Sequence, residues 1–156
     1  MAYHFLFLSL FFLATASYGQ KSEAATKDFP YQLSDVQWQK KLSPTQYRVL
    51  IKKGTEPAFT GDFWDNKRVG VYACAGCEQQ LFLSETKFKS GTGWPSFFNF
   101  IEKSVGVGSD YDLGYLRNEV YCNRCGGHLG HVFNDGPPPT GLRYCINSAA
   151  LIFEEK

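Results

Sequence analysis

Five cysteines are the residues of this chain best suited to chemistry, and their spacing divides them into two groups. Four form two close pairs, Cys74-Ala-Gly-Cys77 and Cys122-Asn-Arg-Cys125, and the fifth, Cys145, stands alone. Two C-x-x-C pairs supply the four soft ligands that Zn²⁺ prefers in a tetrahedral structural site. The pattern predicts one structural zinc ion held by these four cysteines, with no position open for catalysis. The alternative is two disulfides, which an oxidising compartment would permit.

The lone thiol lies in a segment, residues 142–147, that alternates apolar and polar residues as a strand does. Such a strand places its polar members on one face: Arg143, Cys145 and Asn147. A guanidinium two residues from a thiol favours the thiolate, which is the nucleophilic form. Taken alone, a single cysteine is most often an inert small hydrophobe, so the alternative stays open here.

Two histidines precede this segment in His128-Leu-Gly-His131-Val-Phe133. A strand through His131 and Phe133 puts both side chains on one face, and pairing it with the Cys145 strand would bring an acid next to the thiol. The histidines also allow a plainer interpretation, as loop residues or spare zinc ligands. The convergence of thiol, guanidinium, amide and imidazole on one surface favours a thiol-dependent enzyme.

The elements that must position these residues are short. Two capping boxes, Ser34-Asp-Val-Gln37 and Ser43-Pro-Thr-Gln46, predict two N-terminal helices, the second ending at Gly54. From Arg68 onward the pattern predicts strands separated by glycines. The strand candidates are residues 70–73, 80–83, 97–100, 105–107, 115–121, 131–133 and 142–152. We therefore expect a mainly β fold, antiparallel and partly closed, with helices at its edge.

The composition is that of one globular domain, with 44% hydrophobic and 17% aromatic residues and 15 glycines. The formal net charge is +1 and no basic stripe is visible, so nucleic-acid binding has no electrostatic support.

The N-terminus predicts export. Residues 5–13 are apolar except for Ser9, and either Ala14-Thr-Ala16 or Ser17-Tyr-Gly19 fits a cleavage site. We expect a signal peptide over residues 1–19, a linker over 20–30 and the domain over 31–156, in a periplasmic or secreted protein. The apolar stretch is shorter than the ~20 residues that span a bilayer, so no stable membrane insertion is expected. The alternative is a cytosolic protein with an amphipathic start.

Five segments together resemble the methionine-R-sulfoxide reductases, the B type: Gly91-Thr-Gly-Trp94-Pro-Ser-Phe97, the two cysteine pairs, residues 128–133, and residues 143–151. The resemblance runs in order from about Tyr31 to Phe153. It implies two packed antiparallel β-sheets with a structural zinc opposite the active site. It also implies that oxidised proteins or peptides are the substrates.

The same resemblance implies roles for individual residues. Cys145 matches the nucleophile and His131 the acid that protonates the sulfoxide oxygen, with His128, Arg143 and Asn147 completing the polar site. Trp94 matches the aromatic wall for the substrate methyl group, and Phe133 belongs to the same substrate-binding surface. Without the resemblance, Trp94 would be interpreted as core packing beside a Trp-Pro turn.

One departure from the family pattern concerns recycling. Many members carry a second, resolving cysteine at the position of Thr92. With zinc on the four paired cysteines, no cysteine remains to form a disulfide with Cys145. The sulfenic acid must then be reduced by an external thiol donor, a thioredoxin-like protein or a small thiol.

Two other functions remain as alternatives. A non-catalytic, zinc-stabilised β domain that binds a partner or small ligand has no use for a thiol beside an acid. A peroxide-reducing or disulfide-exchange enzyme would normally use a redox-active C-x-x-C, and both pairs here are assigned to metal.

Overall fold

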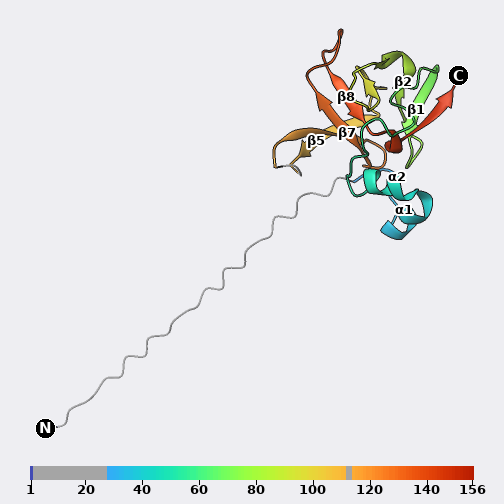
Figure 1. Cartoon of the computed structure of the whole chain (residues 1–156). Coiled ribbons are helices and arrows are strands. Elements are labelled where there is room, and N and C mark those ends of the chain that lie inside the picture. The colour runs from blue at the N-terminus through green and yellow to red at the C-terminus, as the bar shows by residue number, and fades with distance from the viewer. Residues whose placement is uncertain (2–27, 112–113) are drawn as a thin grey trace.

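The computed structural model of the protein describes Met1, residues 28–111 and residues 114–156. The expected signal peptide, except for Met1, and residues 20–27 of the expected linker lie outside the described residues. The described chain is mainly β, with two antiparallel sheets and two short α-helices (Figure 1). The predicted fold class is confirmed. No helix within the described ranges is long and apolar enough to cross a membrane.

The two helices, α1 (Asp35–Lys41) and α2 (Pro44–Leu50), begin where the sequence predicts. Each starts with a complete capping box, formed by Ser34 with Gln37 and by Ser43 with Gln46. The end of α2 differs from the prediction, because the helix stops at Leu50. The left-handed residue after it is Lys53, with φ 56°, and Gly54 N donates to Arg48 O at 2.8 Å.

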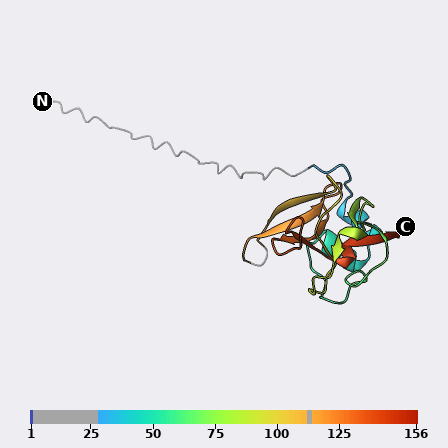
Figure 2. The ribbon, with the colours of Figure 1, turned by 90° about the horizontal axis from the view of Figure 1, so that it is seen from above.

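The smaller sheet has three strands in the order β2-β1-β9, and the larger has six in the order β3-β4-β8-β7-β6-β5. The small-sheet strands are β1 (Gly70–Cys74), β2 (Gln80–Leu83) and β9 (Leu151–Glu155). The large-sheet strands are β3 (Lys87–Phe88), β4 (Ser96–Phe97), β5 (Val105–Asp110), β6 (Arg117–Cys122), β7 (His128–Phe133) and β8 (Arg143–Ile146). Figures 1 and 2 both show the β5 end of the large sheet extending away from the helices and the small sheet.

Aromatic side chains join the two sheets. Phe82 of the small sheet stacks on Phe97 of the large one, with ring centroids 4.4 Å apart and planes at 15°. Tyr72 meets the same Phe97 edge-on at 5.0 Å. These three side chains are fully buried, and such pairs add about 0.5–1.5 kcal/mol each beyond the area that they bury. The core between the sheets thus fixes the larger sheet, which carries the candidate site.

The strand predicted over residues 142–152 is two strands in different sheets, β8 and β9, separated by the 3-10 turn η2 (Ser148–Ala150). The cause is the buried carboxylate of Glu56, which accepts hydrogen bonds from Ser148 N at 2.5 Å and Ala149 N at 2.8 Å. These bonds replace the ladder bonds that a continuous strand would make. The chain therefore leaves the large sheet two residues after Cys145.

Candidate functional site

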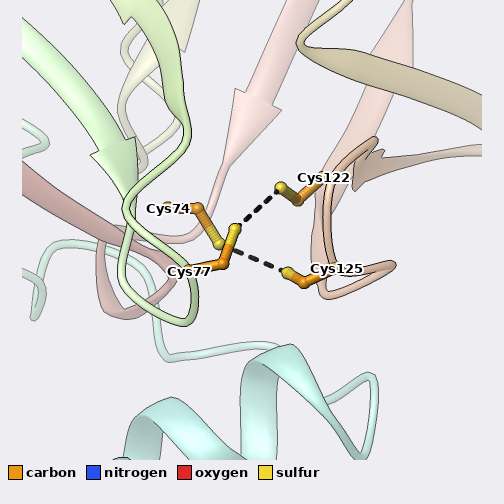
Figure 3. A group of neighbouring side chains, drawn as sticks. All are labelled: Cys74, Cys77, Cys122 and Cys125. Atoms are coloured by element: carbon orange, nitrogen blue, oxygen red, sulfur yellow. Dashed lines mark hydrogen bonds between the residues drawn. The ribbon is translucent and has the colours of Figure 1, made fainter. Parts of the chain in front are cut away.

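The four paired cysteines converge on one point, as Figure 3 shows. Their sulfur atoms all lie within 4.8 Å of one another, with Cys77 and Cys122 3.5 Å apart and Cys74 and Cys125 3.8 Å apart. One pair lies at the turn between β1 and β2, and the other at the turn between β6 and β7. The cluster therefore connects the small sheet to the large one, and a metal ion held there would lock the two together.

The donor set fits a metal cation. The pKa of the Cys74 thiol is raised well above its ordinary value, first by the bond with Cys122 and then by the other two thiols and burial. Four sulfurs this close therefore do not all ionise by themselves. A divalent cation stabilises four thiolates in such a cluster, and structural zinc is the usual occupant.

Cys145 lies at the centre of the larger sheet. Its direct cross-strand partners are Ser96 on β4 and His131 on β7. Its neighbours Tyr144 and Ile146 point into the core, so the thiol is on the opposite face of the sheet. The structure thus brings the thiol and the imidazole to adjacent positions, as the sequence predicts.

Gly130 makes this pairing possible. A Cβ atom on Gly130 would lie 2.0 Å from the carbonyl oxygen of Cys145, so only glycine lets β7 and β8 approach this closely. The ladder between β6 and β7 also has a bulge, because Val120 pairs with Gly130 and Tyr121 with His128. The extra residue turns His128 to the side of His131, and their ring centroids are 5.3 Å apart.

His131 is oriented by a carboxylate. Its Nε2 lies 2.6 Å from Asp110 Oδ2, and Arg117 Nη2 bonds the same oxygen at 2.6 Å. Because a carboxylate only accepts, Nε2 carries a proton, and Nδ1 has no hydrogen-bond partner within the described ranges. Burial lowers the pKa of His131 below its ordinary 6.5, and Asp110 offsets only part of this effect. Its Nδ1 is the atom available to a substrate.

His128 is held by a second carboxylate. Its Nδ1 lies 2.8 Å from Glu119 Oε1, and Lys53 Nζ lies 2.8 Å from Glu119 Oε2. Burial alone would raise the pKa of Glu119, but the bonds from His128 and Lys53 outweigh it and hold that pKa below its usual value. His128 is 2% exposed, and its Nε2 has no partner among the described residues. His128 is therefore a positioning residue, whose buried imidazole is held by Glu119 and packs against the ring of His131.

A chain of three hydroxyl groups begins at the thiol. Thr92 Oγ1 lies 3.9 Å from Cys145 Sγ, Ser90 Oγ lies 2.9 Å from Thr92 Oγ1, and Ser96 Oγ lies 2.7 Å from Ser90 Oγ. Burial nevertheless raises the pKa of Cys145 above its ordinary 9.0, with Arg143 and the hydroxyls of Thr92 and Ser96 opposing it. The thiol is the prevailing form in the free protein.

The expected effect of Arg143 on the thiol is present, but burial outweighs it. The guanidinium does lower the pKa of the thiol, but by less than burial raises it. Two of its nitrogens are bonded to Asp135, with Nε to Oδ1 and Nη2 to Oδ2 both at 2.9 Å. Arg143 also lies over the ring of Phe133, 4.5 Å from its centroid, and is paired with it across the strands. The pair forms one wall of the surface around Cys145.

Asn147 and Trp94 lie at the other end of β8. The Asn147 amide is buried, donating from Nδ2 to Leu129 O at 2.9 Å and accepting from Glu56 N at 3.0 Å. Trp94 is half-buried, and its Nε1 donates to Glu56 O at 3.1 Å. Asn147 therefore braces β7 and β8, while the Glu56 segment holds the Trp94 indole near the site.

Sequence reasoning did not find the carboxylates Asp110, Glu119 and Glu56, nor the hydroxyls of Ser90 and Ser96. One signal was available for Glu119, an acidic residue inside the strand predicted over residues 115–121, whereas Asp110 lies beyond the strand predicted over residues 105–107. A charged side chain buried in a strand requires a partner. The sequence does not reveal which partner, because the pairing depends on strand register.

The fold and the site together define a class of protein: a β domain clamped by a tetracysteine cluster, with a buried thiol beside a carboxylate-held imidazole. Comparisons with known proteins give the family. The SelR domain family matches residues 42–155. A protein of Thiobacillus denitrificans named peptide methionine sulfoxide reductase MsrB is 56% identical over 124 residues, covering 79% of this chain and 94% of the relative.

Proteins with the same name in Leptospira interrogans and Methanosarcina barkeri are 55% and 57% identical. These matches cover 79% and 78% of this chain, and 95% and 86% of the relatives. The chain belongs to the MsrB family of peptide methionine sulfoxide reductases, the SelR domain proteins.

Proposed function

We propose that this protein reduces peptide-bound methionine-R-sulfoxide to methionine, with Cys145 as the nucleophile. The observation that carries the proposal is the direct cross-strand pairing of Cys145 with His131, whose Nε2 is held by Asp110. Family membership supports the substrate class, since the relatives carry the name peptide methionine sulfoxide reductase.

The reaction begins with a proton transfer. A sulfoxide is a poor electrophile until its oxygen is protonated, so attack by sulfur requires a neighbouring acid. His131 accepts the Cys145 proton and presents it from Nδ1 to the sulfoxide oxygen, while Asp110 stabilises the imidazolium. Because burial keeps the thiol protonated in the free protein, the thiolate forms only when it reacts.

The products follow from the balance of atoms. The Cys145 sulfur takes the oxygen from the substrate sulfur, leaving methionine and a cysteine sulfenic acid. The cysteine sulfur loses two electrons and the methionine sulfur gains them. Two external thiols, from a thioredoxin-like protein or a small thiol, then restore Cys145 and leave as a disulfide with one water.

Stereochemical selection requires different contacts for the sulfoxide oxygen and the methyl group. His131 is the polar contact for the oxygen, and Trp94 and Phe133 offer aromatic faces for the methyl group. Asn147 and Arg143 keep their positions by their bonds to backbone groups and to Asp135. The R diastereomer is the expected substrate.

The decisive experiment uses a peptide with one methionine sulfoxide, supplied as separate R and S diastereomers with dithiothreitol. Mass spectrometry should show loss of one oxygen from the R peptide with wild-type protein and none with Cys145→Ser. Circular dichroism should show that Cys145→Ser is folded, so that its loss of activity reports on the thiol alone. Reduction of both diastereomers alike, or reduction by Cys145→Ser, contradicts the proposal.

Two further parts of the proposal concern metal and location. We infer that the tetracysteine cluster holds one structural Zn²⁺, which supplies no chemistry to the reaction because all four positions are taken by protein. We also infer export, from the apolar segment 5–13 and the small residues after it. Mass measurement of the N-terminus of protein recovered from its native cells tests the second inference.

A further inference from the structure

A groove of about 640 Å³ runs from the Gly91–Trp94 loop to the C-terminal end of the described chain. Its walls come from residues 64–70, from η1 (Ser84–Thr86) and β3, and from the loop itself. None of the residues assigned above to proton transfer lines it. Gly91, Gly93 and Trp94 line its near end, and Thr92 between them contacts the Cys145 sulfur. The groove therefore begins at the loop that contacts the reacting thiol.

The near end is rigidly built. Gly93 has φ 86°, and a Cβ atom there would lie 2.8 Å from the Phe59 ring, so the loop packs closely against Phe59. Phe59 N also donates to Gly93 O at 2.8 Å. The ring of Phe59 meets that of Trp64 edge-on, with centroids 5.4 Å apart. Both rings are well exposed, by 56% and 39%, and such aromatic groups at a groove typically mark a binding surface.

The rim is basic. Five cationic side chains line the groove against two acidic ones, which gives +3 where the whole chain carries +1. The cationic residues are Lys67, Arg68, Lys87, Lys89 and Lys156, and the acidic ones are Asp65 and Glu85. The remainder of the chain therefore carries a formal charge of −2. Lys89 and Lys156 have no ion-pair partner among the described residues.

We propose that this groove binds the polypeptide segment that flanks the oxidised methionine and that it selects acidic residues in that segment. The proposal rests on the proposed function, since it places the methionine sulfoxide at Cys145 and the flanking residues in the groove. The exposed rings of Phe59 and Trp64 provide a surface for apolar parts of an extended segment. Acidic residues in the bound segment are favoured by charge complementarity, because the electrostatic free energy of a carboxylate is lower beside the unpaired Lys89 and Lys156.

A docking site for the reductant fits the geometry less well. A thiol donor must reach the Cys145 sulfur itself, whereas the residues that line the groove do not include Cys145. An extended peptide suits both places better, because each of its residues spans about 3.3 Å and Thr92, which contacts the thiol, lies between two glycines that line the groove.

The test compares three peptides of equal length, each with one central methionine sulfoxide flanked by glutamates, by alanines or by lysines. We expect kcat/KM for the glutamate peptide to exceed that for the lysine peptide by about tenfold at low salt, the sum of several exposed ion pairs. Because the pairs are exposed, the ratio should fall toward one in 0.5 M salt, where the Debye length is only a few ångströms. A ratio near one at low salt overturns the proposal while leaving the reductase activity intact.

Variants locate the effect. Lys89→Glu/Lys156→Glu reverses the two unpaired charges of the groove and should bring the glutamate-to-lysine ratio to about one or below. The control Lys40→Glu/Lys103→Glu makes the same change in net charge away from the groove and should keep the tenfold ratio. If the rim variant instead changes KM for the reductant and not the peptide ratio, the groove is a reductant site and the proposal is wrong.

A binding measurement separates this proposal from the proposed function. Cys145→Ser is mixed with a fluorescent glutamate-flanked peptide, and its anisotropy is measured with and without the rim variant. Binding that the rim variant weakens supports the groove even if wild-type protein reduces no peptide, in which case only the proposed function is lost. No binding of the glutamate peptide beyond that of the lysine peptide overturns the groove.

Discussion

Thr92 Oγ1 lies 3.9 Å from Cys145 Sγ, so a hydroxyl group is the first neighbour of the thiol on the glycine-rich loop. A cysteine in this place would set two sulfurs side by side. Threonine cannot form a disulfide, and the other four cysteines converge on a separate cluster. This contact therefore bears directly on how an oxidised Cys145 returns to the thiol.

We predict that one turnover without reductant leaves Cys145 as a sulfenic acid. Dimedone should add one label per chain, on Cys145 alone, and zinc should stay bound. The contrasting variant is Thr92→Cys, in which a disulfide between residues 92 and 145 should form and exclude the label. A disulfide from Cys145 to Cys74, Cys77, Cys122 or Cys125 in the wild-type protein, with metal released, would overturn this prediction.

The fold was largely predictable because its signals are local. The capping boxes at Ser34 and Ser43 each involve residues three apart, and the two cysteine pairs sit in tight turns, so short stretches of sequence determine them. The alternation around Cys145 correctly separated Tyr144 and Ile146, in the core, from the thiol. The strand end at Ile146 was missed because it depends on Glu56, about 90 residues away in sequence.

The site was predictable only in part, for the same reason. The pairing of His131 with Cys145 followed from two strand patterns, but the partners Asp110 and Glu119 depend on the register of β5, β6 and β7. The direction of the Arg143 effect followed from the sequence, but the larger, opposite effect of burial on the thiol did not, because sequence spacing shows neither the burial of Cys145 nor the bond from Arg143 to Asp135. Local spacing predicted the reacting groups, whereas their electrostatics required the tertiary structure.

His131→Ala should slow reduction of the R-sulfoxide peptide by roughly 10² or more, the usual loss for a positioned acid. Asp110→Asn keeps the imidazole but loses the carboxylate that orients it and stabilises the imidazolium, so it should slow the reaction less than His131→Ala does. The measurement is single-turnover rate, with folding checked by thermal unfolding. Val132→Ala, on the opposite face of the same strand, controls for damage to β7. Wild-type rates for His131→Ala would remove this residue from the mechanism.

The pKa shifts predict a broad pH profile. The reaction needs one proton on the pair, with His131 neutral and Cys145 a thiol. The rate is therefore constant at pH values between the pKa of His131 and the pKa of Cys145. The pKa of His131 lies below 6.5 and that of Cys145 above 9.0. We therefore expect kcat/KM to be constant from about pH 6.5 to about 9. Alkylation of Cys145 by iodoacetamide, which needs only the thiolate, should still be rising at pH 9, and a plateau below that pH contradicts the effect of burial.

Loss of one cluster thiol should unfold the domain. Structural zinc binds with roughly 10–16 kcal/mol in small domains, which is as large as the ~5–15 kcal/mol that stabilises a whole fold. Cys125→Ser should therefore lose bound zinc and its cooperative thermal transition, whereas Cys145→Ser, outside the cluster, should keep both. Metal analysis should give one zinc per wild-type chain. A wild-type protein purified under reducing conditions that is folded without metal contradicts this prediction.

Gly130→Ala tests the close contact that sets the thiol beside the imidazole. The new methyl group would lie 2.0 Å from the Cys145 carbonyl oxygen and 3.0 Å from both Cys145 C and Ile146 Cα, so β8 must move away from β7. Overpacking of this kind costs about 1–3 kcal/mol of unfolding free energy. The shift also separates His131 from Cys145, so the single-turnover rate should fall in the protein that remains folded.

The matched control for this variant is Gly108→Ala in β5 of the same sheet. A Cβ atom there would lie 3.4 Å from Tyr121 Cε1, an ordinary contact, and Gly108 is paired with Glu119 rather than with the reacting residues. Urea titration and single-turnover kinetics should show little change in Gly108→Ala and losses of both stability and rate in Gly130→Ala. Equal behaviour of the two variants would mean that the β7–β8 contact does not set the geometry of the site.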